Sequence, residues 1–230
     1  MFDINAHKYY LVRILKDIYS DTLLSSVLGF KGGTAHMLFY NLPRFSVDLD
    51  FNLLDKKESD VVFEKVRKIL SAYGQIKDEA QKYYGLLHVL NYGSHNRNLK
   101  LEISNREYND RYQNLNYLGI IIKVMHVEDM FTHKLCALTD RKSVASRDVF
   151  EIYYFLKDNI KINPEIIKQR TNMDVSEYVD YSISTIKNIK KTSLLNGIGE
   201  LIDEDYKVFV KNKLQDETIH LLQIYKSIYL

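Results

Sequence analysis

The sequence predicts an α/β (α+β) domain with a mixed sheet over residues 1–125, followed by an all-α helical bundle over residues 126–230. Two stretches of the first half, residues 46–53 and 98–104, alternate polar and apolar side chains, which is typical of half-buried strands. Other stretches of that half repeat apolar residues at the spacing of amphipathic helices. After residue 125 the strand pattern disappears, so we place the domain boundary there.

The first expected element is a helix over residues 6–25, in which Leu11, Ile14, Leu15 and Ile18 recur at helical spacing. A turn signal at residues 93–96 separates two strand-like runs and predicts a β-hairpin. The other helices of the first half are expected over residues 35–41 and 56–73, and the strands over residues 27–30, 46–53, 83–92, 98–104 and 120–124. The second half is expected to contain helices over residues 126–138, 147–157, 164–171, 174–189 and 203–229.

Composition places the chain among ordinary globular proteins. Its 230 residues are 46% hydrophobic and 27% charged, and the net charge of +2 gives no bulk attraction for a polyanion. The single cysteine, Cys136, excludes an intramolecular disulfide and fits a reducing cytoplasm. Because no signal-like or membrane-length apolar stretch is present, we expect a cytoplasmic protein without a membrane partner.

Residues 31–53 combine a glycine turn with two acidic residues on one strand face. The turn Gly32-Gly33-Thr34 can open a helix, whose free N–H groups suit phosphate. Asp48 and Asp50 are two residues apart on the expected strand, so their side chains share a face roughly 7 Å apart. Neighbouring carboxylates repel each other unless a cation lies between them, and hard oxygen ligands suit Mg²⁺ or Mn²⁺. These features predict a metal-dependent nucleotide site.

A Gly-Gly-Thr turn followed by Asp-x-Asp on a strand resembles the nucleotidyltransferase superfamily, which has the polymerase-beta-like fold. The longer pattern, FKGGTA followed by LPRFSVDLDF, resembles the AbiEii/AbiGii toxin family, the nucleotidyltransferase half of type IV toxin–antitoxin pairs. Two later stretches, HVEDMFTHKLCAL and RKSVASRDVFE, extend the resemblance, which covers roughly residues 28–155.

The resemblance implies three converging acidic groups, because nucleotidyl transfer needs metal near the triphosphate. Glu102, on the polar face of the neighbouring strand, is the expected third ligand beside Asp48 and Asp50, although the family more often has Asp there. The alternative is an exposed strand carboxylate. The N–H groups of Gly32 and Gly33 and the hydroxyl of Thr34 would bind the β- and γ-phosphates; alternatively, Thr34 is a plain N-cap.

Basic residues complete the implied nucleotide site. Lys31 is either a phosphate contact or a surface lysine, and Arg44 either positions Asp48 or the nucleotide or is an ordinary surface arginine. Lys134 matches the lysine with which the family reaches the phosphates. We expect Lys134 to be solvated, so that its removal should hardly change thermal stability.

The stretch RKSVASRDVFE supplies the last implied residues: Arg141 and Arg147 for nucleotide binding, and Asp148 as a catalytic group that could pair with Lys134 or Arg141. The alternative is a helix-capping Asp148 beside two surface arginines. Because the acidic residues belong to the first part and Lys134 to the second, the site is expected between the two domains.

The resemblance implies a toxin that transfers a nucleotide from an NTP to a cellular acceptor, expected to be the tRNA 3′ end. It also implies a cognate antitoxin with a winged-helix DNA-binding domain. Three alternatives stay open: AMP transfer to a protein hydroxyl, a non-catalytic nucleotide-binding regulatory module, and a defence protein that acts through partner contacts of its helical bundle. The intact pair of Asp48 and Asp50 argues against the second, since a degenerate site should lose a carboxylate first.

Overall fold

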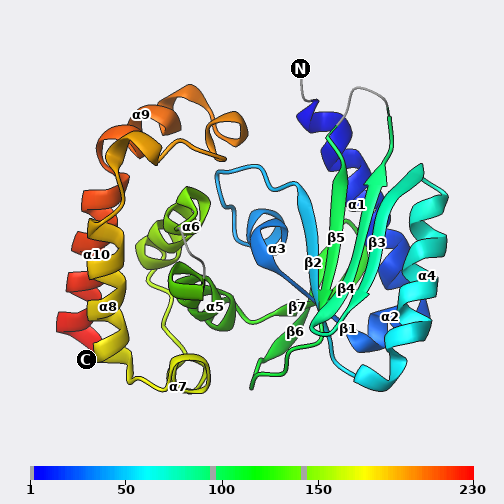
Figure 1. Cartoon of the computed structure of the whole chain (residues 1–230), viewed down its shortest axis with the longest axis horizontal. Coiled ribbons are helices and arrows are strands. Elements are labelled where there is room, and N and C mark those ends of the chain that lie inside the picture. The colour runs from blue at the N-terminus through cyan, green and yellow to red at the C-terminus, as the bar shows by residue number, and fades with distance from the viewer. Residues whose placement is uncertain (1–2, 94–96, 141–143) are drawn as a thin grey trace. The chain divides into compact units, whose positions relative to one another are not determined.

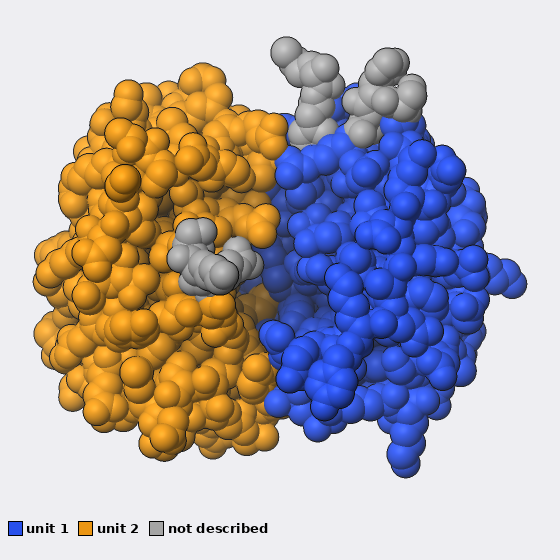
Figure 2. Space-filling model, viewed as in Figure 1, with its two compact units in different colours: residues 1–41, 45–107, 111–125 blue, residues 42–44, 108–110, 126–230 orange. Residues whose placement is uncertain are grey.

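The computed structural model describes residues 3–93, 97–140 and 144–230, which form two compact units (Figure 2). Unit 1 comprises Met1–Asn41, Phe45–Glu107 and Arg111–Met125, and unit 2 comprises Leu42–Arg44, Tyr108–Asp110 and His126–Leu230. The predicted domain boundary at residue 125 stays a prediction, because compactness alone does not show that either part folds independently.

Unit 1 is built on a mixed seven-stranded sheet in the order β3-β4-β5-β2-β1-β7-β6 (Figure 1). Its centre is β2, which pairs antiparallel with β1 and parallel with β5. The strands are β1 Leu28–Lys31, β2 Asp48–Leu53, β3 Gln75–Lys82, β4 Gly85–Asn91, β5 Leu99–Ser104, β6 Tyr112–Tyr117 and β7 Ile120–Met125.

Helices cover the sheet unequally. Figure 1 shows α1 Ile4–Ser20, α2 Thr22–Val27 and α4 Ser59–Ser71 on one face, whereas α3 Gly32–Phe39 lies beside β2 on the other. On β2, Leu49, Phe51 and Leu53 are buried, and the Phe51 ring lies 6.5 Å from that of Tyr19 in α1. The intervening Asp48 and Asp50 therefore point to the opposite face, the one that carries α3.

The predicted β-hairpin is confirmed, since β4 and β5 pair antiparallel from Gly85↔Ser104 to Leu90↔Leu99; residues 94–96 of its turn lie outside the described residues. The prediction of one helix over residues 6–25 is wrong. The chain is extended at Asp21, with φ −82° and ψ 124°, and the Asp21 carboxylate accepts hydrogen bonds of 3.0 Å from Leu23 N and Leu24 N. Asp21 thus ends α1 and caps a second helix.

Unit 2 is helical, and its helices are α5 Val127–Asp140, α6 Ser146–Lys157, α7 Pro164–Thr171, α8 Val175–Lys187, α9 Glu204–Asn212 and α10 Leu214–Tyr229. The single helix predicted over residues 203–229 is wrong, because Lys213, with φ −130°, separates α9 from α10. Asp129 in α5 is fully buried and accepts a 2.8 Å hydrogen bond from Asn163 at the start of α7. Its carboxylate therefore ties two helices of the bundle together.

Candidate active site

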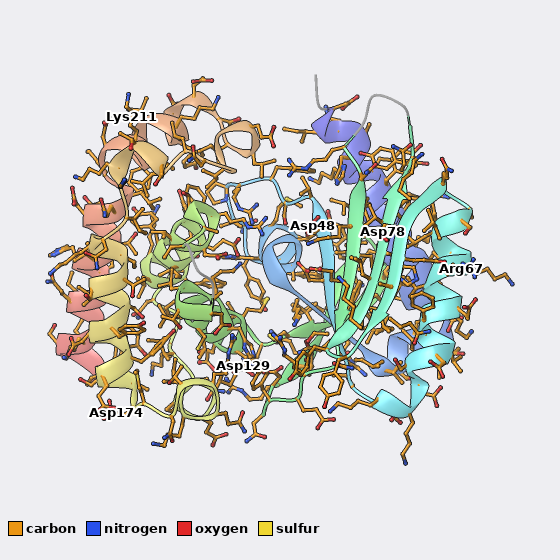
Figure 3. The ribbon with its side chains drawn as sticks, viewed as in Figure 1. Asp48, Arg67, Asp78, Asp129, Asp174 and Lys211 are labelled. Atoms are coloured by element: carbon orange, nitrogen blue, oxygen red, sulfur yellow. The ribbon has the colours of Figure 1, made fainter. Side chains whose placement is uncertain are left out.

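The three predicted acidic residues of unit 1 lie on adjacent strands in one register. Strands β2 and β5 pair in parallel with Asp48 opposite Lys100 and Asp50 opposite Glu102. Because residues opposite each other in a sheet share a face, all three carboxylates point to the side of the sheet that carries α3. Figure 3 labels Asp48 at this position. The alternation read from the sequence thus predicted which carboxylates the fold gathers.

The glycine turn lies directly against Asp50. Gly32 begins α3 with φ +79°, and a Cβ at this residue would stand 2.6 Å from Asp50 Oδ2. Glycine is therefore required twice, once for the left-handed backbone and once for the close approach. Gly33 and Thr34 follow and are buried, while Lys31 precedes the turn opposite Asp50 in the β1–β2 pairing.

Thr34 holds the start of α3 against the acidic strand. Its buried hydroxyl donates a 2.5 Å hydrogen bond to the backbone carbonyl of Asp48. The phosphate contact expected for this hydroxyl stays a prediction, and in the structure its single hydrogen serves the α3–β2 junction. The N–H groups of the first helical turn remain the natural donors for an anion.

Sequence reasoning did not assign a role to Lys100, which lies among the carboxylates. Its ammonium is 3.0 Å from Glu102 Oε2 and 3.8 Å from Asp48 Oδ2. Burial by itself would lower the pKa of Lys100, but the carboxylates of Asp48 and Glu102 outweigh it and raise that pKa. The signal was present in the sequence, because Lys100 alternates onto the polar face together with Glu102.

The pKa of Asp50 is raised to about 6, mainly by burial, then by the negative charge of Asp48, with a smaller contribution from Glu102. Lys31 and Lys100 act in the opposite direction. The positive groups of the protein thus do not fully offset the burial and the negative charges that disfavour the ionised form of Asp50. A cation at this place would stabilise the ionised form, which is the electrostatic requirement of a metal ligand.

The donor set fits a hard divalent cation, since Asp48, Asp50 and Glu102 supply carboxylate oxygens on one face. As placed, however, the side chains within residues 3–93, 97–140 and 144–230 bring no three His, Cys, Asp or Glu groups close enough to hold a metal ion. The ammonium group of Lys100 supplies a positive charge beside the carboxylates of Asp48 and Glu102. Rotation of its long side chain can move this ammonium away from Asp48.

A pocket of about 500 Å³ opens over this part of unit 1. Lys31, Asp50 and Glu102 line it, as do Tyr83, Tyr84 and Arg106 from the β3–β4 turn and the end of β5. Its volume is within the range of sites that bind nucleotide-sized molecules. Two of the three carboxylates, those of Asp50 and Glu102, therefore border a space large enough for a ligand, together with Lys31 at the start of the glycine turn.

Lys134 and Arg44 form a second charged cluster, within unit 2. Lys134 Nζ lies 3.1 Å from Asp148 Oδ1 and 3.3 Å from Glu151 Oε2, and Arg44 Nη2 lies 2.5 Å from Glu151 Oε1. Asp148 and Glu151 are almost completely buried in α6. They raise the pKa of Lys134, against the effect of burial. The predicted pairing of Lys134 with Asp148 is thus present.

The expectation of a solvated Lys134 is wrong, because its side chain is 18% exposed and ion-paired twice. Arg44 is likewise no surface arginine, since it is 5% exposed. Arg147 is half-buried near the start of α6, and Arg141 lies outside the described residues. The assignment of these five residues, Asp148 included, to the nucleotide stays a prediction.

No helix in the described part of the chain is long and apolar enough to cross a lipid bilayer. Several solved structures share the fold of this chain. JHP933 from Helicobacter pylori matches with a TM-score of 0.61 at 18% identity, covering 99% of this chain and 94% of that one. A candidate nucleotidyltransferase from H. pylori gives a TM-score of 0.62 at 18% identity, with 96% and 94% covered. An antigenic nucleotidyltransferase-like protein from Paracoccidioides brasiliensis gives 0.51 at 12%, with 84% and 94% covered. The fold is that of a nucleotidyltransferase.

A search of curated proteins gives no match. The family model described as nucleotidyl transferase AbiEii toxin, Type IV TA system, matches residues 13–221. The chain therefore belongs to the AbiEii family of nucleotidyltransferase toxins of type IV toxin–antitoxin systems. It is an enzyme of the nucleotidyltransferase class, with an NTP as the implied substrate and an antitoxin as the implied partner, rather than a non-catalytic regulatory module.

Proposed function

We propose that this enzyme transfers a nucleoside monophosphate from an NTP to the 3′ end of tRNA in a reaction that depends on Mg²⁺ or Mn²⁺. The observation that carries the proposal is the register of Asp48, Asp50 and Glu102 beside the Gly32 turn. Carboxylates for a cation and backbone N–H groups for phosphate lie on adjacent elements, which is the arrangement that a triphosphate with its cation requires.

Asp48 and Asp50 would hold the metal ion, with Glu102 as the third carboxylate. When bound, the ion neutralises the triphosphate and lowers the pKa of the attacking hydroxyl. The N–H groups of Gly32 and Gly33 would receive the β- and γ-phosphates, and Lys31 would add a point charge beside them. The acceptor hydroxyl then attacks the α-phosphorus, and pyrophosphate leaves.

We also assign roles in nucleotide binding to the second cluster, in unit 2. Lys134 would contact phosphate through one of its three N–H donors while Asp148 and Glu151 fix its position. We assign Arg141 and Arg147 to nucleotide contacts as well, and Arg44 to positioning through Glu151. The choice of tRNA as acceptor rests on the family resemblance, as does the winged-helix DNA-binding domain of the antitoxin.

The decisive experiment incubates the purified protein with each labelled NTP in turn, together with total tRNA and a protein extract, in Mg²⁺ or Mn²⁺. The label should appear on tRNA, and removal of the 3′-terminal nucleotide from the labelled tRNA should remove the label. Label on protein would instead identify AMP transfer to a protein hydroxyl. If neither fraction is labelled with any NTP, the proposed transfer reaction is wrong. The Asp50→Asn variant serves as the inactive control for adventitious transferases.

A further inference from the structure

We propose that the turn between β3 and β4, together with Arg106, is a stacking platform for an unpaired nucleobase. The inference deepens the proposed function and rests on it, since the base would belong to a ligand held at the carboxylate site. Two sources share this chemistry: the base of the NTP and the terminal base of an RNA acceptor.

The turn presents two aromatic rings to solvent. Tyr83 is 86% exposed and Tyr84 is 58% exposed, and their centroids lie 4.7 Å apart in an edge-to-face arrangement. Among the large hydrophobic residues in the described ranges, Tyr83 is the most exposed. Single exposed aromatic residues are common, so exposure alone assigns no role to them. Their position is the informative observation.

Both tyrosines line the pocket that contains Asp50 and Glu102. The β4–β5 pairing sets Gly85, the residue after the turn, opposite Ser104, two residues beyond Glu102 on the same strand face. At about 3.3 Å per residue, Ser104 lies roughly 7 Å from Glu102 along β5, so the platform begins about two residues beyond the Glu102 carboxylate. The pocket thus has an ionic end and an aromatic end.

The turn is fixed by the end of β5. Asn105 N donates a 3.2 Å hydrogen bond to the Tyr84 carbonyl, and Asn105 Nδ2 donates a 3.0 Å bond to the Tyr83 carbonyl. Gly85 packs so closely that a Cβ there would stand 2.3 Å from the carbonyl oxygen of Ile103. A platform held in this way loses little conformational entropy when a ligand binds.

The chemistry of the aromatic end suits a nucleobase. The Arg106 guanidinium lies over the Tyr84 ring, with Cζ 4.7 Å from the centroid, so a planar cation and two phenol rings stand together. Unstacked bases bind on tyrosine rings and on arginine planes. Lys82 and Arg106 also supply positive charge for a phosphate backbone. A peptide strand cannot add to β4, because β3 and β5 already pair with both of its edges.

The test compares Tyr84→Leu and Tyr83→Leu with Tyr84→Phe and with a matched control, Tyr9→Leu. Tyr9 on α1 is 57% exposed. Like Tyr84, it has an arginine over its ring, since Arg13 Cζ lies 5.8 Å from the ring centroid. Leucine keeps an apolar side chain and removes the ring. Thermal melts of all variants establish that they are folded before binding is measured.

Four probes separate the sources: an NTP, inorganic tripolyphosphate, a short single-stranded RNA, and the same RNA with an abasic 3′ end. If the platform holds the NTP base, the two leucine variants bind NTP about tenfold more weakly and bind tripolyphosphate unchanged. If it holds the acceptor base, the same loss appears for the intact RNA and not for the abasic one. Tyr84→Phe should retain wild-type binding, since the ring is kept.

The proposal of a platform would be overturned if the two leucine variants lost equal affinity for probes with and without the base. It would also be overturned if they lost affinity for none of the probes. The same conclusion follows if Tyr9→Leu weakens binding as much as Tyr84→Leu, or if the wild-type protein binds none of the four probes. A wild-type enzyme that binds NTP or RNA with a base-dependent contribution but transfers nothing would leave the platform standing. That result would overturn the proposed transfer reaction instead.

Discussion

At the scale of single residues, the Gly32–Asp50 contact places the glycine turn and the acidic strand together, and Gly32→Ala tests it. The left-handed φ of +79° costs about 1–2 kcal/mol for an L-residue, and the added Cβ would meet Asp50 Oδ2 at 2.6 Å. We expect the variant to fold with stability reduced by about that amount and to lose most of its transferase activity, because Asp50 must move.

The control for Gly32→Ala is Gly119→Ala. Gly119 has a similar φ of +82°, but a Cβ there would have no heavy atom within 4 Å. Both variants should therefore lose similar stability in a denaturant titration, whereas Gly119→Ala should keep its activity. Parallel losses of activity in the two variants would show that backbone strain, rather than the contact with Asp50, is responsible.

Asp50→Asn removes the charge of the central carboxylate with little change of volume. Because burial and Asp48 already oppose the ionised form of Asp50, the substitution should leave the protein folded and equally stable or somewhat more stable. Transfer activity and toxicity in a growth assay should both be abolished. A folded Asp50→Asn protein that still arrests growth would place the chemistry elsewhere. Circular dichroism provides the folding control.

The residues of unit 1 were easier to predict than those of unit 2. Period-two alternation is enough to set Asp48, Asp50 and Glu102 on one face, and the pairing of β2 with β5 then brings them together. The burial of Lys134 was missed. Helical spacing sets Asp148 and Glu151 one turn apart, but it does not show that their face is buried against the helix that carries Lys134. Ion pairs between elements depend on tertiary packing, which local patterns do not encode.

At the scale of elements, the buried ion pairs join α5 to α6, and Lys134→Ala tests their energetic role. Removing Lys134 takes away one ion-pair partner of Asp148. Glu151 also loses its ion pair with Lys134 and keeps the one with Arg44. Loss of one member of a buried charge cluster typically costs about 3–5 kcal/mol, and the remaining access of Lys134 to water places our expectation near the lower end. Urea titration should show this loss in the free energy of unfolding.

Lys191→Ala is the matched control for this prediction. Its ammonium pairs with Asp216 at 2.8 Å, but the two side chains are 57% and 65% exposed. An exposed pair contributes at most about 1 kcal/mol. If Lys134→Ala is no more destabilising than Lys191→Ala, the cluster does not stabilise the bundle. Any loss of activity in Lys134→Ala would then report on nucleotide binding.

A second element-scale prediction concerns the packing of β4 on α4. His88 is fully buried, its ring is tilted against that of Phe63 with the centroids 4.5 Å apart, and its pKa is lowered to about 4, mainly by burial. The unfolded chain takes up the proton near pH 6.5, whereas the folded protein does so near pH 4. The contribution of neutral His88 is therefore present above pH 6.5 and is lost as the pH falls towards 4, by about 3 kcal/mol.

The His88→Phe variant should flatten the pH dependence of the free energy of unfolding between pH 6.5 and 4, because the ring remains and the titration disappears. Unfolding curves at several pH values measure the difference from the wild-type protein. Identical slopes for the two proteins would show that His88 is not protonated on unfolding in this range.

The sequence patterns did not predict strands β3 and β6, and the two failures have a common physical reason. Strands β3 and β6 lie at the two edges of the sheet, and the β3 sequence, QIKDEAQK, has no apolar face to produce a period of two. Edge strands are often charged because this discourages pairing with other chains. Central strands, by contrast, must bury one face, so β2 and β5 could be predicted from alternation.

At the scale of the whole molecule, charge decides how a triphosphate binds. The net charge of +2 on 230 residues gives no general attraction for a polyanion, and the pocket places Asp50 and Glu102 beside Lys31. In EDTA the carboxylates should therefore repel the triphosphate. We expect Mg²⁺ or Mn²⁺ to tighten NTP binding at least about tenfold, or about 1.4 kcal/mol, in a calorimetric titration.

The control is the double variant Asp48→Asn/Asp50→Asn, which removes two negative charges and two metal ligands at once. In EDTA it should bind NTP more tightly than the wild-type protein, since the repulsion is gone, and added Mg²⁺ should improve its affinity little. Two carboxylates within about 7 Å of a phosphate contribute enough repulsion to be measured even at the high effective dielectric of a surface site. Equal NTP affinity of the wild-type protein in EDTA and in Mg²⁺ would contradict the assignment of these two residues to the metal.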